Sequence, residues 1–276
     1  MEPPLPCRGT ATGARHGGGR TAMKLDGARV WLTGASSGIG EALVAGLVSA
    51  GAHLAISARR ADRLDEIVSA RRRPDRRLLA IPADVTDREA LRSAAARIAS
   101  DFGAIDLAVF NAGIGRRLRV DAFDADDFVS VMTTNVFGVI YGIEAVLPGM
   151  LARRSGRIAA VASLAGYRSV PTLAGYGTSK AAVIHALECL RYDLRPHGIG
   201  VTIINPGYVR TPMTAENTYR MPFLIDADRA AAIIIRGLER DKKEIHFPLP
   251  FSLLLKILRI LPYPVYERLI TAVVKR

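Results

Sequence analysis

The sequence predicts an α/β fold, a doubly wound parallel sheet of about seven strands with helices on both faces. Three observations support this prediction. Short apolar runs with β-forming composition alternate with longer stretches of helical periodicity between residues 23 and 248. The early runs are apolar on both faces, as parallel strands between two layers of helices must be. A glycine-rich turn joins the first run to the first helical stretch, where such folds bind ligands.

The individual elements follow in chain order. The strands are expected at 29–33, 53–58, 78–83, 105–110, 157–162, 200–205 and 244–247. Helices are expected near 41–50, 61–72, 87–101, 125–152, 175–195 and 226–240. Thr86 and Glu89 have the spacing of a capping box, so the third helix should start there. Strands that alternate with helices in this way form βαβ units and therefore a parallel sheet.

The composition fits one globular domain with two extensions. At 49% hydrophobic and 23% charged, the 276-residue chain is not collagen-like, coiled-coil or wholly disordered. Residues 1–22 are rich in glycine, proline and arginine; we expect a disordered tail, with no apolar core of a signal peptide. No composition break interrupts 23–248, the expected catalytic domain, and 249–276 should form a helical extension. Cys7 and Cys189 cannot form a disulfide framework, which favours a cytoplasmic protein.

The net charge of +12 raises the question of a nucleic-acid or membrane partner. The basic residues lie in separate segments at 71–77, 116–119 and 153–157, without interleaved aromatic residues. We therefore interpret them as solvated surface and expect no nucleic-acid partner.

The turn after the first strand predicts a nucleotide site. Residues 33–40 read Thr-Gly-Ala-Ser-Ser-Gly-Ile-Gly and lead directly into a helix. Glycines there allow the backbone to approach a pyrophosphate, which then lies at the positive end of the helix. The turn residues expected to hold a dinucleotide are Gly34, Ser36, Ser37, Gly38, Ile39 and Gly40.

The end of the second strand indicates which dinucleotide is bound. A fold that selects NAD carries an acid there for the ribose hydroxyls, whereas this chain has Ala58 followed by Arg59. A guanidinium pairs with a 2′-phosphate, and the missing carboxylate removes a repulsion. The sequence therefore predicts NADP, with NADPH as the reduced form, and no metal.

A catalytic group is expected on the fifth helical stretch. Tyr176 and Lys180 are four residues apart and share one helix face. An ammonium close to a phenol stabilises the phenolate, so Tyr176 could act as a general acid or base. Ser163 follows the fifth strand, and its hydroxyl should enter the same crevice at the carboxyl edge of the sheet.

Together these residues resemble the short-chain dehydrogenase/reductase family, in its compact single-domain branch. The matching motifs are TGASSGIG at 33–40, Asp84-Val85, Asn-Ala-Gly at 111–113, Asn135, Ser163, the Tyr176/Lys180 pair and PGYVRT at 206–211. The resemblance covers about residues 25–248. It implies a Rossmann fold and hydride transfer between a nicotinamide and a carbonyl or secondary alcohol.

The resemblance also implies a role for each matching residue. Asp84 and Val85 would flank the adenine, and Asn111, Ala112 and Gly113 would support the cofactor along the fourth strand. Asn135 would help hold a water that relays protons to Lys180, which would also bind the nicotinamide ribose. Ser163 and Tyr176 would bind the substrate oxygen. The remaining cofactor contacts expected in the sixth-strand motif are Pro206, Gly207, Val209 and Thr211. Tyr167 lacks a lysine four residues later and is interpreted as a pocket wall.

Residues 250–276 are expected to form amphipathic helices. Ser252, Lys256 and Arg259 make a narrow polar stripe in an otherwise apolar stretch, and eleven residues span only about half of a bilayer core. We expect these helices to pack on the catalytic domain or on a second subunit near the substrate opening. A peripheral membrane contact is the alternative.

The substrate loop, near 212–225, is also apolar, which favours a lipophilic ketone or aldehyde. We expect a homodimer or homotetramer. A competing hypothesis is a protein that binds NADP as a sensor or scaffold without turnover. The complete set of Ser163, Tyr176 and Lys180 argues against it.

Overall fold

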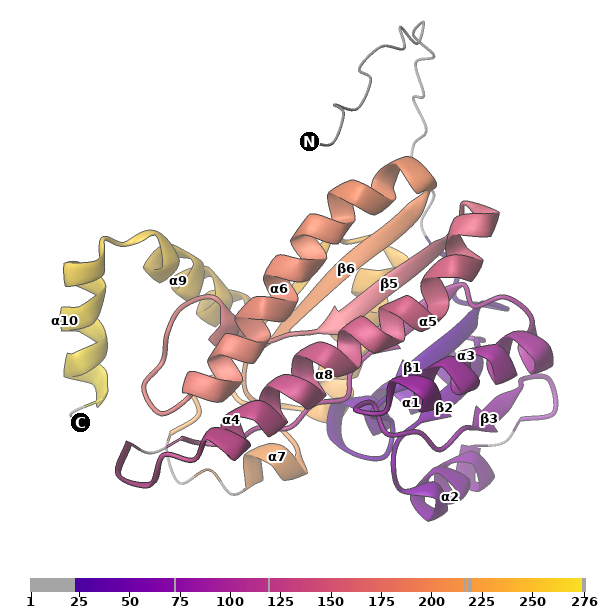
Figure 1. The fold of residues 1–276 in the computed structure, drawn as a ribbon, viewed down its shortest axis with the longest axis horizontal. Helices are drawn as coiled ribbons and strands as arrows, with labels where there is room; N and C mark the ends of the chain where they lie inside the picture. Colours follow the sequence, from indigo (N-terminus) through magenta and orange to yellow (C-terminus); the bar gives the residue numbers. More distant parts are fainter. Residues whose placement is uncertain (1–22, 72, 119, 216, 218–219, 275–276) are drawn as a thin grey trace, which may run out of the picture.

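The computed structural model describes residues 23–71, 73–118, 120–215, 217 and 220–274; the tail at 1–22 lies outside them. Its centre is a parallel seven-stranded sheet in the order β3-β2-β1-β4-β5-β6-β9 (Figure 1). The strands are β1 (Arg29–Thr33), β2 (His53–Ser57), β3 (Leu78–Ala80), β4 (Leu107–Phe110), β5 (Gly156–Val161), β6 (Ile199–Pro206) and β9 (Glu244–Phe247). The predicted doubly wound fold is confirmed. Two short strands, β7 (Val209–Arg210) and β8 (Ile225–Asp226), pair separately.

Helices cover both faces of the sheet. They are α1 (Gly38–Ser49), α2 (Ala61–Arg71), α3 (Arg88–Phe102), α4 (Ala125–Met132), α5 (Gly138–Arg153), α6 (Ala174–Leu194), α7 (Pro212–Ala215), α8 (Ala227–Glu239), α9 (Leu249–Ile260) and α10 (Tyr263–Val274). One core forms between the sheet and α1, α2 and α8, and a second forms between the sheet and α3, α5 and α6. The strand order reverses between β1 and β4, so a crevice is expected at their carboxyl ends.

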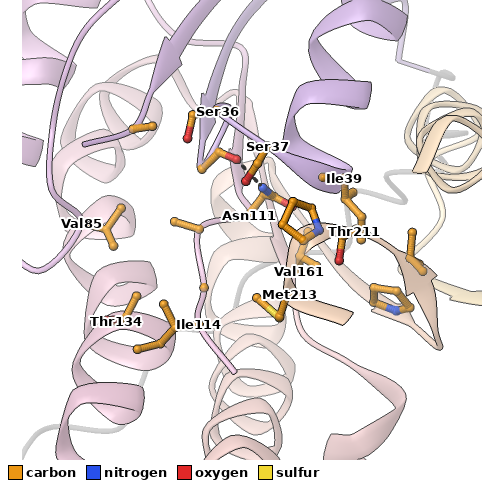
Figure 2. A pocket seen from close by; sticks show the side chains of 18 of the residues that line it. Ser36, Ser37, Ile39, Val85, Asn111, Ile114, Thr134, Val161, Thr211 and Met213 are labelled. Carbon is orange, nitrogen blue, oxygen red and sulfur yellow. Dashed lines mark hydrogen bonds between the residues drawn. The ribbon is translucent and has the colours of Figure 1, made fainter. Parts of the chain in front are cut away.

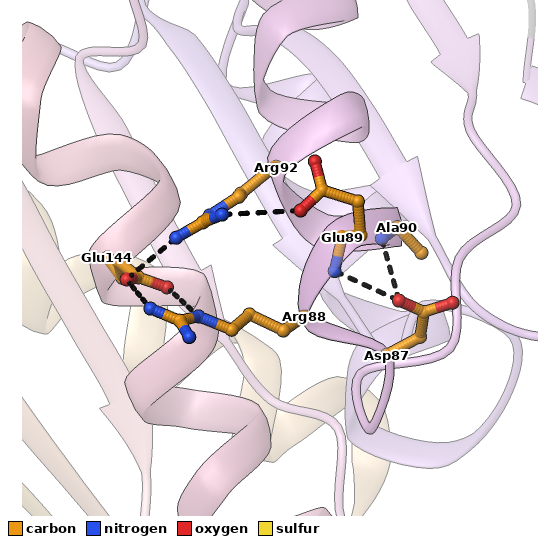
Figure 3. A network of polar contacts seen from close by, with 6 residues as sticks. All are labelled: Asp87, Arg88, Glu89, Ala90, Arg92 and Glu144. Carbon is orange, nitrogen blue, oxygen red and sulfur yellow. Dashed lines mark hydrogen bonds and ion pairs between the residues drawn. The ribbon is translucent and has the colours of Figure 1, made fainter.

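The third helix begins one residue later than a capping box at Thr86 would give. Asp87 is its N-cap, and Oδ1 of Asp87 accepts hydrogen bonds from the backbone N–H groups of Glu89 and Ala90, both at 2.9 Å. Arg88 and Arg92 of α3 both bind the Glu144 carboxylate of α5, as Figure 3 shows. The hydrogen bond from Arg88 is the main cause that lowers the pKa of Glu144 to about 2. This ion pair joins two neighbouring helices of one layer.

The helix expected at 125–152 is interrupted. Residues Thr133–Phe137 form a π-helical turn between α4 and α5, and Asn135 lies within it, fully buried. By length and hydropathy alone, 125–153 is the one stretch in the described residues that could cross a membrane. Its buried side chains, including Val139, Ile143 and Val146, instead pack into the core beneath the sheet. It is therefore a core helix with a local break.

The C-terminal helices project from one edge of the sheet (Figure 1). The inner face of α9 packs through Phe251 and Leu255 on the catalytic domain, and Tyr266 of α10 is buried. The predicted packing is thus confirmed for this face. The outer face carries large apolar side chains that are exposed in the single chain, and their packing on a second subunit stays a prediction: Leu249, Leu253, Leu254, Ile257, Ile260, Tyr263, Val265 and Leu269.

Candidate active site

A cleft of about 340 Å³ lies at the carboxyl ends of the central strands. In Figure 2, Val85 and Thr134 lie on one side of the cleft and Ile39 and Thr211 on the other, with Asn111 between them. Of the predicted site residues, those that line it are Gly34, Ser36, Ser37, Gly38, Ile39, Arg59, Asp84, Val85, Asn111, Ala112, Gly113, Ser163, Tyr176, Lys180, Pro206, Gly207, Val209 and Thr211. The structure therefore brings together residues from the ends of six strands, β1 to β6.

The glycine-rich turn leaves the start of α1 open to the cleft. Ser37 is the N-cap of α1, yet its side chain makes no capping hydrogen bond. Gly38 has a φ of 56°, a left-handed conformation that disfavours other residues. Backbone N–H groups at the start of a helix attract anions, so this turn fits the pyrophosphate of a dinucleotide.

Of the six turn residues predicted to hold the dinucleotide, Gly40 is the one that does not line the cleft. A Cβ atom at Gly40 would lie 2.0 Å from the carbonyl oxygen of Gly34. The glycine is therefore needed for close packing of α1 against the turn, and its predicted contact with the cofactor stays a prediction.

Two arginines stand at the end of β2. Arg59 and Arg60 are exposed, and both line the cleft beside the buried Ala58. Arg60 donates from Nη2 to the backbone oxygen and to Oγ of Ser36, both at 3.0 Å. The sequence predicted Arg59 alone, since the contact of Arg60 with the turn depends on how the chain folds back.

Asn111 connects two strand ends below the cofactor cleft. Its Nδ2 donates to the carbonyl oxygen of Gly34 at 3.0 Å and to that of Thr33 at 3.3 Å. Asn111 thus fixes the distance between β1 and β4.

The cleft has one acidic side chain among its described lining residues, Asp84. Its Oδ1 accepts hydrogen bonds from the backbone N–H and the hydroxyl of Thr86.

Lys180 is buried on the inner face of α6, with 4% of its surface exposed. Its Nζ donates to the carbonyl oxygen of Val161 at 2.8 Å and lies 5.6 Å from the centre of the Tyr176 ring. Burial lowers the pKa of Lys180 to about 8. The amine therefore remains mostly protonated at pH 7 and holds a positive charge next to the phenol.

Asn135 lies behind this pair rather than in the wall of the cleft. Its side chain bonds the backbone N–H and C=O of Ile114 at 2.8 and 2.9 Å, and it donates to Ser179 Oγ at 3.0 Å. Ser179 in turn donates to the carbonyl oxygen of Tyr176. The side chain of Asn135 thus links the loop after β4 to α6. The water that would relay protons to Lys180 stays a prediction.

Tyr167 does not form a pocket wall. Its hydroxyl bonds the carboxylate of Glu244 and accepts from Asn205 Nδ2, and 5% of its surface is exposed. Burial and the hydrogen bond to Glu244 raise the pKa of Tyr167 well above its usual value. Lys256 of α9 donates to the same carboxylate at 2.6 Å, so this cluster anchors α9 to β9.

A second cavity, of about 180 Å³, adjoins the first. Ser163, Tyr176, Gly207, Met213 and Thr214 line both. We call it the substrate cavity, because it is the site that we propose for the substrate. Of the apolar residues predicted in the substrate loop, Met213 lines it, whereas Met221, Pro222, Phe223 and Leu224 do not.

Sequence reasoning missed three arginines of the substrate cavity. Arg116, Arg117 and Arg168 line it, although the first two had been interpreted as solvated surface. For Arg116 and Arg117, the available signal was their position shortly after the Asn-Ala-Gly motif at the end of β4. Arg116 and Arg117 are exposed as predicted, whereas the solvated interpretation is wrong for Arg157, which is buried and paired with Asp241.

Comparisons with known proteins agree with this geometry. The family model described as short chain dehydrogenase matches residues 28–221. An uncharacterized oxidoreductase of Myxococcus xanthus is 32% identical over 236 residues, which cover 86% of this chain and 93% of that protein. A short-chain dehydrogenase of Burkholderia cenocepacia, solved in complex with NADP, has a TM-score of 0.78 at 26% identity and covers 90% of this chain and 99% of its own.

A second solved structure differs in its cofactor. The short-chain dehydrogenase/reductase of Burkholderia phymatum, in complex with NAD, has a TM-score of 0.76 at 25% identity, over 85% of this chain and 93% of its own. The family match and the shared fold agree with the cleft built from the strand ends. The chain belongs to the short-chain dehydrogenase/reductase family of oxidoreductases.

Proposed function

We propose that this protein is an NADPH-dependent reductase of lipophilic ketones or aldehydes, acting on the carbonyl/alcohol pair. The observation that carries the proposal is that Ser163 and Tyr176 line both the cofactor cleft and the substrate cavity. A carbonyl placed between them would meet both hydroxyls. A bound NADPH would supply the hydride to the carbonyl carbon at this junction.

In this proposal Tyr176 donates its proton to the carbonyl oxygen. Lys180 stabilises the resulting phenolate, because its buried ammonium group lies 5.6 Å from the ring centre. Its bond to Val161 fixes the amine in place. Ser163 holds the carbonyl oxygen; its own Oγ is oriented by the backbone N–H of Ala165 at 3.1 Å.

The preference for NADP rests on the two arginines after β2. Arg59 is assigned to the 2′-phosphate, and Arg60, which bridges to the glycine-rich turn, adds positive charge beside it. Asp84 is engaged with Thr86, and Ala58 leaves no carboxylate at the end of β2. These charges favour a phosphorylated ribose.

A lipophilic substrate is supported by the walls of the substrate cavity. Phe251 and Leu255 of α9 and Leu173 next to α6 give it apolar surface. A screen of NADPH oxidation with medium-chain ketones and aldehydes, sugars, quinones and acyl thioesters tests this. We expect turnover of the apolar ketones and aldehydes; NADPH binding without oxidation by any carbonyl would instead favour a non-catalytic sensor or scaffold.

We further propose a cytoplasmic enzyme that touches a membrane surface through the outer face of α9 and α10. Eight large apolar side chains are exposed there, next to the exposed Arg259 and Arg268. Burying such a side chain contributes about 1.5–3 kcal/mol, and the arginines suit anionic lipids. The inner face of the same helices forms the substrate cavity, so a substrate could enter from the bilayer surface.

Flotation with vesicles tests the membrane contact. The protein should float with vesicles that contain phosphatidylserine, less so in high salt, and the double variant Leu253→Asp/Ile257→Asp should not. If the wild type stays in the soluble fraction, the face is not a membrane surface.

Self-association is proposed separately, as a homodimer or homotetramer. Val129, Phe137 and Ile140 of the α4–α5 segment are exposed and could meet a second copy. Light scattering of the purified protein tests this, since a monomeric mass would contradict it.

A further inference from the structure

The substrate cavity is apolar along its walls but positively charged. Three of its lining residues are arginines, Arg116, Arg117 and Arg168, and none of its lining residues in the described chain is acidic. The aromatic and aliphatic lining alone would suit a neutral molecule. The arginines add a feature that a neutral ketone would not use.

We propose that the substrate is an anionic amphiphile: a carbonyl compound whose apolar chain carries a carboxylate or phosphate group that binds Arg168. This inference rests on the proposed function and narrows its substrate class. The carbonyl is placed at Ser163 and Tyr176, and the chain lies along Leu173, Phe251 and Leu255.

Arg168 is held in a fixed position by neutral partners. Its Nη1 donates to the carbonyl oxygen of Arg259 at 2.8 Å, and its guanidinium carbon lies 4.5 Å from the centre of the Tyr266 ring. The Tyr266 hydroxyl donates to the carbonyl oxygen of Ser169, which keeps that ring beside Arg168. A guanidinium that is already oriented loses little conformational freedom when it binds an anion.

The charge of Arg168 is not matched by a carboxylate in the described part of the chain. Arg116 differs, because it forms an ion pair with Asp127 and its side chain is 52% exposed. Arg168 is only half-buried, so an anion can reach it. These contacts assign the anion to Arg168.

Two head groups share this chemistry, and the experiment separates them. Calorimetric titration of the full-length protein, saturated with NADP, uses four probes of equal chain length below their aggregation limits. They are decanoate, decyl phosphate, decan-1-ol and decyltrimethylammonium. We expect at least one of the two anions to bind about tenfold tighter than the alcohol, an advantage that falls with added salt.

Variants identify the residue. Arg168→Gln removes the charge but keeps a polar side chain with an N–H donor, and Arg168→Lys keeps the charge. The Gln variant should lose most of the anion's advantage over decan-1-ol, and the Lys variant should keep part of it. Arg97→Gln, a control on the exposed surface of α3 with its own partner Asp101, should change nothing.

The outcome decides between head groups or rejects the proposal. Preference for decanoate, for decyl phosphate or for both supports it and names the group. Equal affinity for the alcohol, tighter binding of the ammonium, or an advantage unchanged in Arg168→Gln overturns it. These measurements need no turnover, so a failed reduction assay with intact anion preference would reject only the proposed function, and the reverse pattern would reject only this inference.

Discussion

The cofactor cleft and the C-terminal helices differ in how their side chains are positioned and buried, although both contribute to the candidate active site. Around the cleft, each residue is placed by a strand end, a helix start or a turn, and most side chains are buried or bonded to the backbone. In α9 and α10, one face contributes Phe251, Leu255 and Tyr266 to the substrate cavity, and the opposite face is exposed. In the proposed function, the chemistry therefore takes place at the edge of the sheet, whereas the choice of substrate depends on the two C-terminal helices.

The largest effect is expected at Lys180, on the rigid side of this comparison. Lys180→Ala should lower kcat/KM by about 10²–10⁴-fold and also weaken NADPH binding, because the amine serves both the phenol and the cofactor. Steady-state kinetics and fluorescence titration measure the two losses. The exposed Lys242→Ala should change neither. A variant that retains most of its activity would remove Lys180 from the proposed mechanism.

Cofactor preference comes next in size. Arg59→Ala should reduce the ratio of NADPH to NADH affinity by about tenfold to a hundredfold, because it removes a charge-assisted pair between the guanidinium and the 2′-phosphate. Arg60→Ala should do less, since its guanidinium is shared with Ser36. Titration of both cofactors checks this, with Arg63→Ala, whose partners are Glu41 and Glu66, as the control. Equal affinities in the wild type would contradict the assignment.

A matched pair on α9 tests whether its two faces differ in function. Phe251→Ala removes a wall of the substrate cavity and should raise KM for an apolar ketone by about tenfold. Leu253→Ala, two residues away on the exposed face, should leave KM unchanged in a membrane-free assay. Similar effects of both variants would mean that α9 acts only as a structural support.

The smallest effect is expected far from both regions, at Glu144. Its pKa of about 2 lies below that of the unfolded chain, so its contribution to stability is present above the unfolded value and is lost as the pH falls towards 2. The carboxylate is near solvent, and the contribution is therefore small. Urea unfolding should find Glu144→Gln slightly less stable than the wild type at pH 7 and equally stable near pH 2. A constant difference would show that another contact is responsible.

The parts that the sequence predicts are those governed by local rules. Strand periodicity, the turn at 33–40 and the Tyr176/Lys180 spacing each require only a few neighbouring residues, and the structure brings them to one cleft. The π turn around Asn135 was missed because a helix that shifts its hydrogen bonds by one residue keeps its apolar periodicity. Arg168 was missed because its partners, Arg259 and Tyr266, are about ninety residues away in sequence. The sequence left open what covers the outer face of α9, because amphipathicity alone does not identify the partner of a helix face.

The central claim is that Tyr176 protonates a carbonyl held between the two cavities, and one measurement tests it most directly. NADPH oxidation by Tyr176→Phe should be compared with that of the wild type, using the best ketone from the screen, while NADPH binding is measured on the same samples. We predict a fall in kcat of about 10²–10⁴-fold with nearly unchanged cofactor affinity, because only the proton donor is removed. Near-wild-type turnover by Tyr176→Phe would contradict the account.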